Sequence, residues 1–292
     1  MMTVIEHIKR TGLLLDGAMG TMLMRKGIKS GTIPELMNLE KPDIILDIHR
    51  AYLDAGSDMI TTNTFGGSRI KLKKAGLENE TENINRSAAA IARQAVSQDQ
   101  FVAGDIGPLG DMLQPFGLIS VDEAQQNFSE QAYFLADAGV DVFIIETMFD
   151  VNESLAAIRG ILAVSDLPIF ATLTFESTSN GFNTIMGNPV SDSMKILVDA
   201  GATAVGANCS IGSDHMVKLA EEIRNCVKTP VIIQPNAGIP EMKEGQLHYP
   251  ESPAYYARNI KAIRDSGGEI VGGCCGTTPE YISEIKRLLS QS

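Results

Sequence analysis

Eight short apolar runs, rich in β-branched residues, recur along this chain and constrain its fold more than any other feature of the sequence. Segments with helical spacing lie between most of them, for example 122–138 and 194–200, and these segments frequently end in an Ala-Gly pair. Apolar strands that alternate with amphipathic helices are typical of a parallel sheet covered by helices. The runs span residues 13–16, 58–63, 101–105, 141–146, 168–174, 202–208, 230–236 and 269–273.

Eight such units in 292 residues favour a closed sheet over an open one, so we predict an α/β fold with a single (β/α)8 TIM barrel. A doubly wound sheet is the alternative. Length does not decide the number of domains, because such barrels run past the usual domain size without splitting. The interior holds no linker rich in proline, serine or charge. We therefore expect one domain, residues 1–292.

Charge and hydropathy argue against two classes of partner. The chain carries 36 acidic and 24 basic side chains, and its basic residues are scattered, so we expect no nucleic-acid surface. It has no run of about 18 apolar residues, and its first residues do not resemble a signal peptide, so we expect no membrane partner and a cytoplasmic protein. Four cysteines, two of them adjacent, are too few for a disulfide framework and indicate metal or redox chemistry.

Polar and special residues follow the predicted strands. In a barrel they would all face the C-terminal rim, where catalytic groups lie. The sequence therefore predicts an active site at this rim. The residues are Asp16, Gly17, Asn63, Thr64, Asp105, Glu146, Thr147, Asn208, Cys209, Asn236, Cys274 and Cys275.

Three of the cysteines can form a metal site. Cys274 and Cys275 end the eighth run within GGCCG, and Cys209 ends the sixth. Three thiolates from two strand ends could hold Zn²⁺ in a tetrahedron with one open position, as in catalytic zinc sites. Alternatively, adjacent cysteines on a strand point in opposite directions, and one could pack in the core. Cys226, in the helical stretch 216–227, is expected in the core.

The charge of such a site favours one kind of chemistry. Three thiolates leave Zn²⁺ with a formal charge of about −1, which makes it a poor generator of hydroxide. A substrate thiol in the open position would lose its proton and stay electron-rich toward an alkyl group. The cysteine set therefore favours alkylation of a thiol over hydrolysis.

Asp16 and Glu146 are candidate substrate-binding residues. Each ends an apolar strand, where a buried carboxylate needs a partner such as the ammonium group of an amino acid. Alternatively, each caps the turn that follows. The DGAMG segment, with Gly17 and Ala18, could offer backbone N–H groups to a carboxylate, and we include Asn208 among the substrate-binding candidates. The four histidines show no ligand spacing and are expected at the surface or as caps.

These motifs resemble the homocysteine S-methyltransferase family, which includes the homocysteine domain of cobalamin-dependent methionine synthase and betaine-homocysteine methyltransferase. The resemblance covers nearly the whole chain and is most specific in its cysteine motifs. Two segments, TTNTFGGSRIKL and QPNAG, are more similar to the methionine synthase branch. The matching segments are LLLDGAMGTMLMRKG, TTNTFGGSRIKLKKAGL, GDIGPLG, IIETM, GANCSIG, QPNAGIP and GGCCGTTPEYI.

The resemblance implies a (β/α)8 barrel with Zn²⁺ on Cys209, Cys274 and Cys275, which are also the catalytic positions. It implies that Asp16 and Glu146 hold the amino group of L-homocysteine. It also implies that Asn236 supplies a fourth ligand when no thiol is bound; alternatively, Asn236 only orders its turn. The expected product is methionine.

The methyl donor is a separate expectation. Methionine synthases of the cobalamin type carry folate, corrinoid and activation domains that these 292 residues lack. We therefore expect methylcobalamin carried by a separate corrinoid protein or domain, and the chain could be a fragment of a longer protein. The alternatives are a small donor such as S-methylmethionine or betaine, the thiol side of a corrinoid demethylation system, or a structural zinc-binding barrel without activity.

Overall fold

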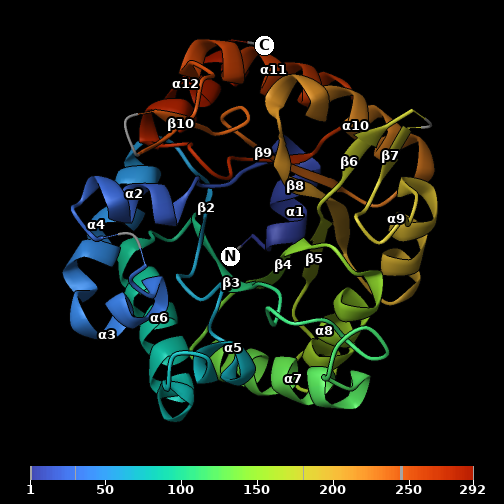
Figure 1. Cartoon of the computed structure of the whole chain (residues 1–292). Helices are drawn as coiled ribbons and strands as arrows, with labels where there is room; N and C mark the ends of the chain where they lie inside the picture. Colours follow the sequence, from blue (N-terminus) through green and yellow to red (C-terminus); the bar gives the residue numbers. More distant parts are fainter. Residues whose placement is uncertain (1, 30, 180, 244–245, 292) are drawn as a thin grey trace.

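Eight parallel strands form a nearly closed barrel in the computed structural model, which describes residues 2–29, 31–179, 181–243 and 246–291. The barrel predicted from the sequence is confirmed, and the open doubly wound sheet is not found. Going round the barrel, the strands follow the order β1-β12-β9-β8-β5-β4-β3-β2 (Figure 1). They are β1 (Leu13–Leu14), β2 (Met59–Thr61), β3 (Phe101–Ile106), β4 (Val142–Met148), β5 (Ile169–Leu173), β8 (Ala204–Gly212), β9 (Val231–Asn236) and β12 (Ile270–Val271).

Carboxylates help to close the seam between β1 and β2. The Asp58 N–H donates to the Leu14 carbonyl at 2.7 Å, and the Leu14 N–H donates to Oδ2 of Asp58 at 2.9 Å. Further along the seam, the Thr61 N–H donates to Oδ2 of Asp16 at 2.9 Å. Side-chain oxygens thus replace some of the carbonyl acceptors of a regular strand ladder, because β1 is only two residues long.

Helices surround the barrel (Figure 1), and several of them begin with a side-chain cap and are followed by a glycine with positive φ. Helix α7, for example, begins where the Ser120 hydroxyl accepts from the Glu123 N–H, and the chain turns after it at Gly139, whose φ is 89°. The helices are α1 (Val4–Thr11), α2 (Met19–Arg25), α3 (Met37–Glu40), α4 (Pro42–Asp54), α5 (Arg69–Lys73), α6 (Thr81–Ala95), α7 (Val121–Asp137), α8 (Val151–Leu162), α9 (Val190–Asp199), α10 (Ser213–Cys226), α11 (Pro253–Asp265) and α12 (Pro279–Leu289). None in the described ranges is long and apolar enough to span a membrane.

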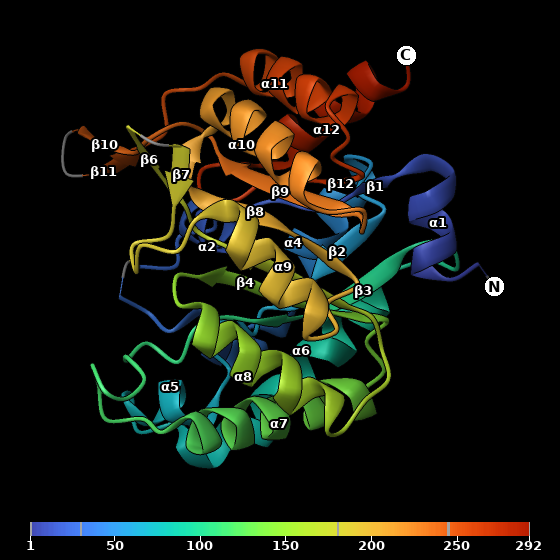
Figure 2. The same cartoon turned by 90° about the vertical axis from the view of Figure 1, so that its right-hand side faces the viewer.

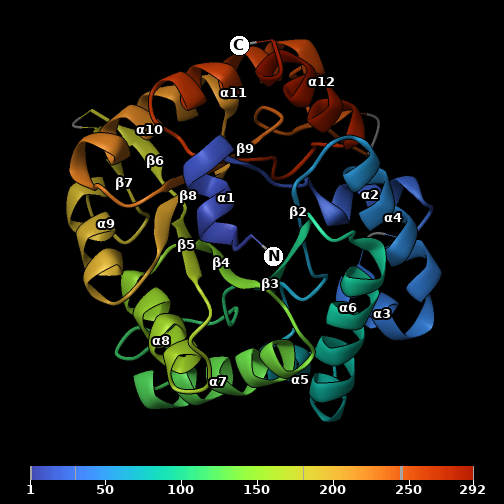
Figure 3. The ribbon, with the colours of Figure 1, turned by 180° about the vertical axis from the view of Figure 1, so that it is seen from behind.

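The two ends of the barrel differ. Helix α1 lies across the N-terminal end, where Val4 and Ile8 pack with inward side chains such as Leu15 and Met59 (Figure 3). Two short hairpins, β6 (Glu176–Thr178) with β7 (Gly181–Asn183) and β10 (Glu241–Lys243) with β11 (Gln246–His248), lie at the opposite end (Figure 2). The C-terminal mouth is therefore the open end of the barrel.

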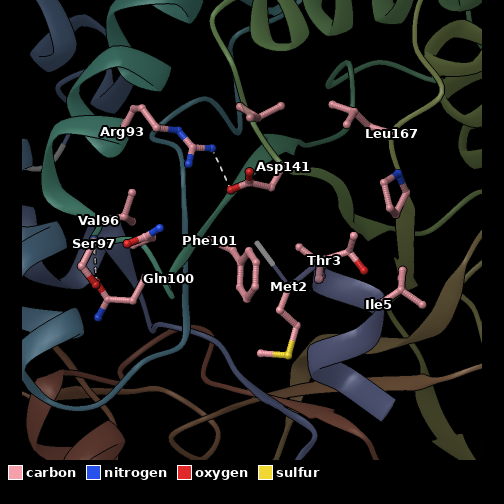
Figure 4. A pocket seen from close by; sticks show the side chains of 14 residues that line it. Met2, Thr3, Ile5, Arg93, Val96, Ser97, Gln100, Phe101, Asp141 and Leu167 are labelled. Atoms are coloured by element: carbon pink, nitrogen blue, oxygen red, sulfur yellow. Dashed lines mark hydrogen bonds and ion pairs between the residues drawn. The ribbon is translucent and has the colours of Figure 1, made fainter. Parts of the chain in front are cut away.

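A cavity of about 660 Å³ lies beside α1 at the N-terminal end (Figure 4). It is lined largely by apolar side chains such as Phe101 and Leu167, and its charged groups pair with each other. Arg93 donates to Oδ2 of Asp141 at 2.7 Å. Its lining contains no cysteine among the described residues. This cavity therefore offers no chemistry of the kind that the sequence predicts.

Two predictions of residue environment were wrong. Cys226 ends α10 and is exposed, and its thiol donates to the Glu222 carbonyl at 3.1 Å. His49 is fully buried in α4, and neither ring nitrogen has a hydrogen-bond partner in the described part of the chain. Burial lowers the pKa of His49 to about 4, so this ring stays neutral near neutral pH. Helical spacing placed Cys226 on a helix but did not identify its exposed side, and His49 was not assigned to a helix from the sequence.

Candidate active site

A cavity of about 310 Å³ opens at the C-terminal mouth, and nine of the twelve predicted rim residues line it, whereas Thr64, Asn208 and Asn236 do not. Its wall contains three thiols and four carboxyl groups, and no lysine, arginine or histidine among the residues that the structure describes. The lining residues that the argument uses are Asp16, Gly17, Ala18, Glu35, Thr61, Asp105, Glu146, Thr147, Cys209, Tyr249, Gly273, Cys274 and Cys275.

The three sulfur atoms form one side of this cavity. The Sγ atoms of Cys209, Cys274 and Cys275 all lie within 4.8 Å of one another, and those of Cys209 and Cys275 are 4.0 Å apart. Zn–S bonds of about 2.3 Å at tetrahedral angles place sulfurs about 3.8 Å apart. Three thiols at this spacing fit a Zn²⁺ ion.

The backbone around Cys274 and Cys275 explains how adjacent cysteines face the same cavity. Both follow β12 and lie in a turn, where the Thr277 N–H donates to the Cys274 carbonyl at 3.1 Å. The alternative in which the two side chains alternate across a strand therefore does not apply. The turn continues through Gly276 at φ 83°, where a Cβ would lie 2.2 Å from Cγ of Tyr249. Only glycine fits there.

Cys209 has an unusual backbone as well. Its φ is 60°, and Ser210 and Thr147 also have positive φ values, of 60° and 59°. Non-glycine residues adopt this conformation at a cost, and such residues cluster at functional sites. Hydrogen bonds from the Cys274 and Cys275 thiols lower the pKa of Cys209 to about 3, and the Asn236 side chain adds to this effect. The cluster therefore stabilises a thiolate at Cys209.

Three carboxyl groups from the strand ends also line the cavity. Asp16 follows β1, Asp105 lies in β3 and Glu146 lies in β4. Burial raises the pKa of Asp16 to about 7, while hydrogen bonds from Thr61 oppose the shift. Burial, followed by the Cys209 thiolate, raises the pKa of Glu146 to about 8. Such shifts mark carboxyl groups whose charge lacks a partner within the protein.

Asn208 holds Glu146 and the neighbouring strands in place. Its Oδ1 accepts from the Thr147 N–H and the Thr172 hydroxyl, both at 2.8 Å. Its Nδ2 lies 2.8 Å from Oγ1 of Thr147 and 3.3 Å from Oε2 of Glu146. Asn208 is fully buried and is not part of the cavity wall. These contacts use the hydrogen-bonding capacity of the amide within the protein.

Gly17 and Ala18 line the cavity as the sequence predicts, whereas Asn236 lies at the end of β9 outside the cavity wall. Asn236 ends β9 and is 5% exposed, and its Oδ1 is buried and accepts no hydrogen bond from the described residues. Gly17 and Ala18 line the cavity just before α2, and the Ala18 N–H donates to Oγ1 of Thr277 at 3.2 Å. A Cβ on Gly17 would lie 2.6 Å from the same Thr277 oxygen, so the chain needs glycine there.

Sequence reasoning assigned no substrate role to Asp105 and did not single out Glu35 or Tyr249, all of which line the cavity. Asp105 carried a signal, since it ends an apolar strand as Asp16 and Glu146 do. Glu35 belongs to a short 3-10 helix, residues 34–36, and its Oε1 accepts from the Gly66 N–H at 2.6 Å. Tyr249 follows the β10–β11 hairpin. No local pattern identified these last two residues.

Comparisons with known proteins identify the family of the chain. A family model described as homocysteine S-methyltransferase matches residues 13–289. The chain is 28% identical to the methionine synthase of Mycobacterium leprae and 29% identical to that of Mycobacterium tuberculosis, with 97% of the chain aligned in each case. It spans about a quarter of the length of these relatives, 24% and 25% respectively.

Solved structures share the fold. The metallated form of the homocysteine methyltransferase MmuM from Escherichia coli superposes with a TM-score of 0.82 at 23% identity, and the match covers 98% of this chain and 99% of that one. A methyltransferase from Methanosarcina mazei superposes with a TM-score of 0.63 at 10% identity, over 96% of this chain and 94% of its own.

Proposed function

Because this chain belongs to the homocysteine S-methyltransferase family, we propose that it transfers a methyl group to the thiol of L-homocysteine and yields methionine. The cavity itself carries this proposal. Its wall contains a cluster of three sulfurs and four carboxyl groups, and no basic side chain of the described residues lines it. A molecule with a thiol and a cationic group complements both kinds of side chain, and homocysteine has both.

Cys209, Cys274 and Cys275 would hold Zn²⁺, and the Asn236 amide oxygen would be a fourth ligand while no thiol is bound. The spacing of the sulfurs and the unpartnered Oδ1 of Asn236 support this assignment. A bound Zn²⁺ would lower the pKa of a substrate thiol, so that the sulfur is deprotonated near neutral pH.

The remaining residues would orient the substrate. Glu146 and Asp16 would accept hydrogen bonds from its ammonium group, which compensates for the burial of their charge. Backbone N–H groups of the segment that begins at Gly17 would meet its carboxylate, with Ala18, whose own N–H donates to Thr277, lining the cavity beside them. Asn208 would act through Glu146 rather than by direct contact. The deprotonated sulfur then forms a bond to the methyl carbon while the bond between that carbon and the donor breaks.

We propose a methyl-corrinoid, carried by a separate protein or domain, as the donor. The sequence resemblance to the methionine synthase branch supports this choice, and the chain spans only about a quarter of those relatives. The test supplies methylcobalamin, S-methylmethionine or betaine with L-homocysteine and measures methionine. Methionine formed only from the corrinoid is the expected result. Methionine from a small donor would refute the corrinoid assignment while retaining the acceptor.

X-ray absorption at the zinc edge tests the acceptor side without any donor. The zinc-loaded chain is expected to show three sulfurs and one lighter ligand, and four sulfurs after L-homocysteine is added. The Cys226→Ser variant is a matched control, because Cys226 is exposed on α10 and is not one of the three clustered cysteines. An unchanged shell in the presence of the thiol would contradict thiol activation at this site.

A further inference from the structure

Asp105 is the carboxyl group of the cavity whose contacts the site does not yet explain. It is 6% exposed and lines the cavity, and its Oδ1 is buried without a hydrogen bond from any residue in the described ranges. The other carboxyl groups of the wall each accept at least one hydrogen bond: Asp16 from Thr61, Glu146 from Asn208 and Glu35 from Gly66. A buried acceptor without a donor is unfavourable, so we expect Oδ1 of Asp105 to accept a hydrogen bond from a bound ligand.

The backbone of Asp105 is held without help from its side chain. Its N–H donates to Oγ1 of Thr62 at 3.0 Å, and its carbonyl accepts from Oγ1 of Thr64 at 2.7 Å. It also belongs to the ladder between β3 and β4, opposite Ile144. The carboxyl group therefore has no evident structural role and is free to contact a ligand.

The cavity offers no protein cation to Asp105. Because its described wall contains no lysine, arginine or histidine, a cationic donor must come with the ligand. Burial and the neighbouring carboxyl groups of Glu146, Asp16 and Glu35 raise the pKa of Asp105 well above its usual value. An entering cation would relieve this repulsion.

We propose that Asp105 is a specificity-determining residue that accepts a hydrogen bond from the ammonium group of the acceptor thiol. This inference rests on the proposed function and deepens it. A primary ammonium group carries three N–H donors, and three carboxyl groups, those of Asp16, Asp105 and Glu146, stand at the ends of β1, β3 and β4. The site is thus selective for thiols that carry a primary amine over thiols that carry only a carboxylate.

Calorimetric titration of the zinc-loaded chain tests this role without a methyl donor. The two probes are L-homocysteine and 4-sulfanylbutanoate, which has the same sulfur and carboxylate but no amino group. We expect Asp105→Asn to weaken L-homocysteine binding about ten- to hundredfold, as expected for loss of a charge-assisted hydrogen bond, and to leave 4-sulfanylbutanoate binding within about twofold. The zinc content should be unchanged.

Glu153→Gln is the matched control. Glu153 is a buried carboxyl group in α8 that accepts from the Leu109 N–H at 2.7 Å and lies outside the cavity wall, so its variant should preserve the preference for L-homocysteine. Equal weakening of both thiols by Asp105→Asn, or no effect on either, would overturn the inference while the proposed function stands. A wild-type chain that binds neither thiol would overturn both.

Discussion

Replacing Glu146 by glutamine should stabilise the metal-free chain while weakening substrate binding. Burial raises the pKa of Glu146 from 4.5 to about 8, so the folded chain binds a proton here that the unfolded chain releases. Protonated Glu146 is compatible with burial, so its contribution to the stability of the folded chain is greatest below pH 4.5, where the group is protonated in both states. This contribution is lost as the pH rises through 8, where the buried group must also ionise. Glutamine does not ionise, and its oxygen can still accept from Asn208.

The magnitude follows from the shift. Ionisation stabilises the unfolded chain by about 1.4 kcal/mol for each pH unit above 4.5. The gain in unfolding free energy of Glu146→Gln over the wild type should therefore be about 1 kcal/mol at pH 5 and about 3 kcal/mol at pH 7.

Urea unfolding at both pH values, with a chelator and a reductant present, measures this difference. Glu40→Gln provides the control, because it removes the same charge from an exposed position at the end of α3. A gain that is equal at pH 5 and pH 7, or a loss of stability at pH 7, would refute the desolvation argument. In the zinc-loaded chain, Glu146→Gln should weaken L-homocysteine binding with the zinc content unchanged, and an unaltered binding curve would contradict its substrate role.

Three further predictions test the cysteine cluster and the residues that support the site. Cys209→Ser should lose zinc and methyl transfer together, whereas the control Cys226→Ser should keep both. Metal analysis and a methionine assay measure the two properties. Retention of zinc by Cys209→Ser would remove this residue from the ligand set. Asn208→Ala should lower the unfolding free energy by about 2 kcal/mol, because it leaves the Thr147 N–H without an acceptor, while the Thr172 hydroxyl keeps the Ile145 carbonyl. It should also raise the KM for L-homocysteine, and urea unfolding and steady-state kinetics measure the two effects. Gly276→Ala should lower the free energy of unfolding by about 1–2 kcal/mol for its positive φ alone. It should also weaken zinc binding, because a Cβ would collide with the Tyr249 ring. An unchanged melting temperature and zinc affinity would show that the turn adapts.

The order of strands and helices could be predicted because it depends on local periodicity. Each apolar run indicates a buried strand, and each segment with helical spacing indicates a helix with one apolar face. The convergence of Asp16, Glu146 and Cys209 on one mouth then follows, since all strands of a parallel barrel end on the same side. The hairpins β6–β7 and β10–β11 were missed because they are short and carry no apolar run.

Within the site, the sequence by itself determined the residues that follow the apolar strands, but only the tertiary structure decided which of them line the cavity and how each is used. Asn208 has its amide occupied by Thr147, 61 residues away, and Thr172, 36 residues away, whereas Oδ1 of Asp105 is left without a donor. Both are polar residues near the end of an apolar strand, so the same local pattern describes them. Their roles differ because hydrogen-bond satisfaction depends on neighbours brought together by barrel closure, and a local sequence window contains no information about those neighbours.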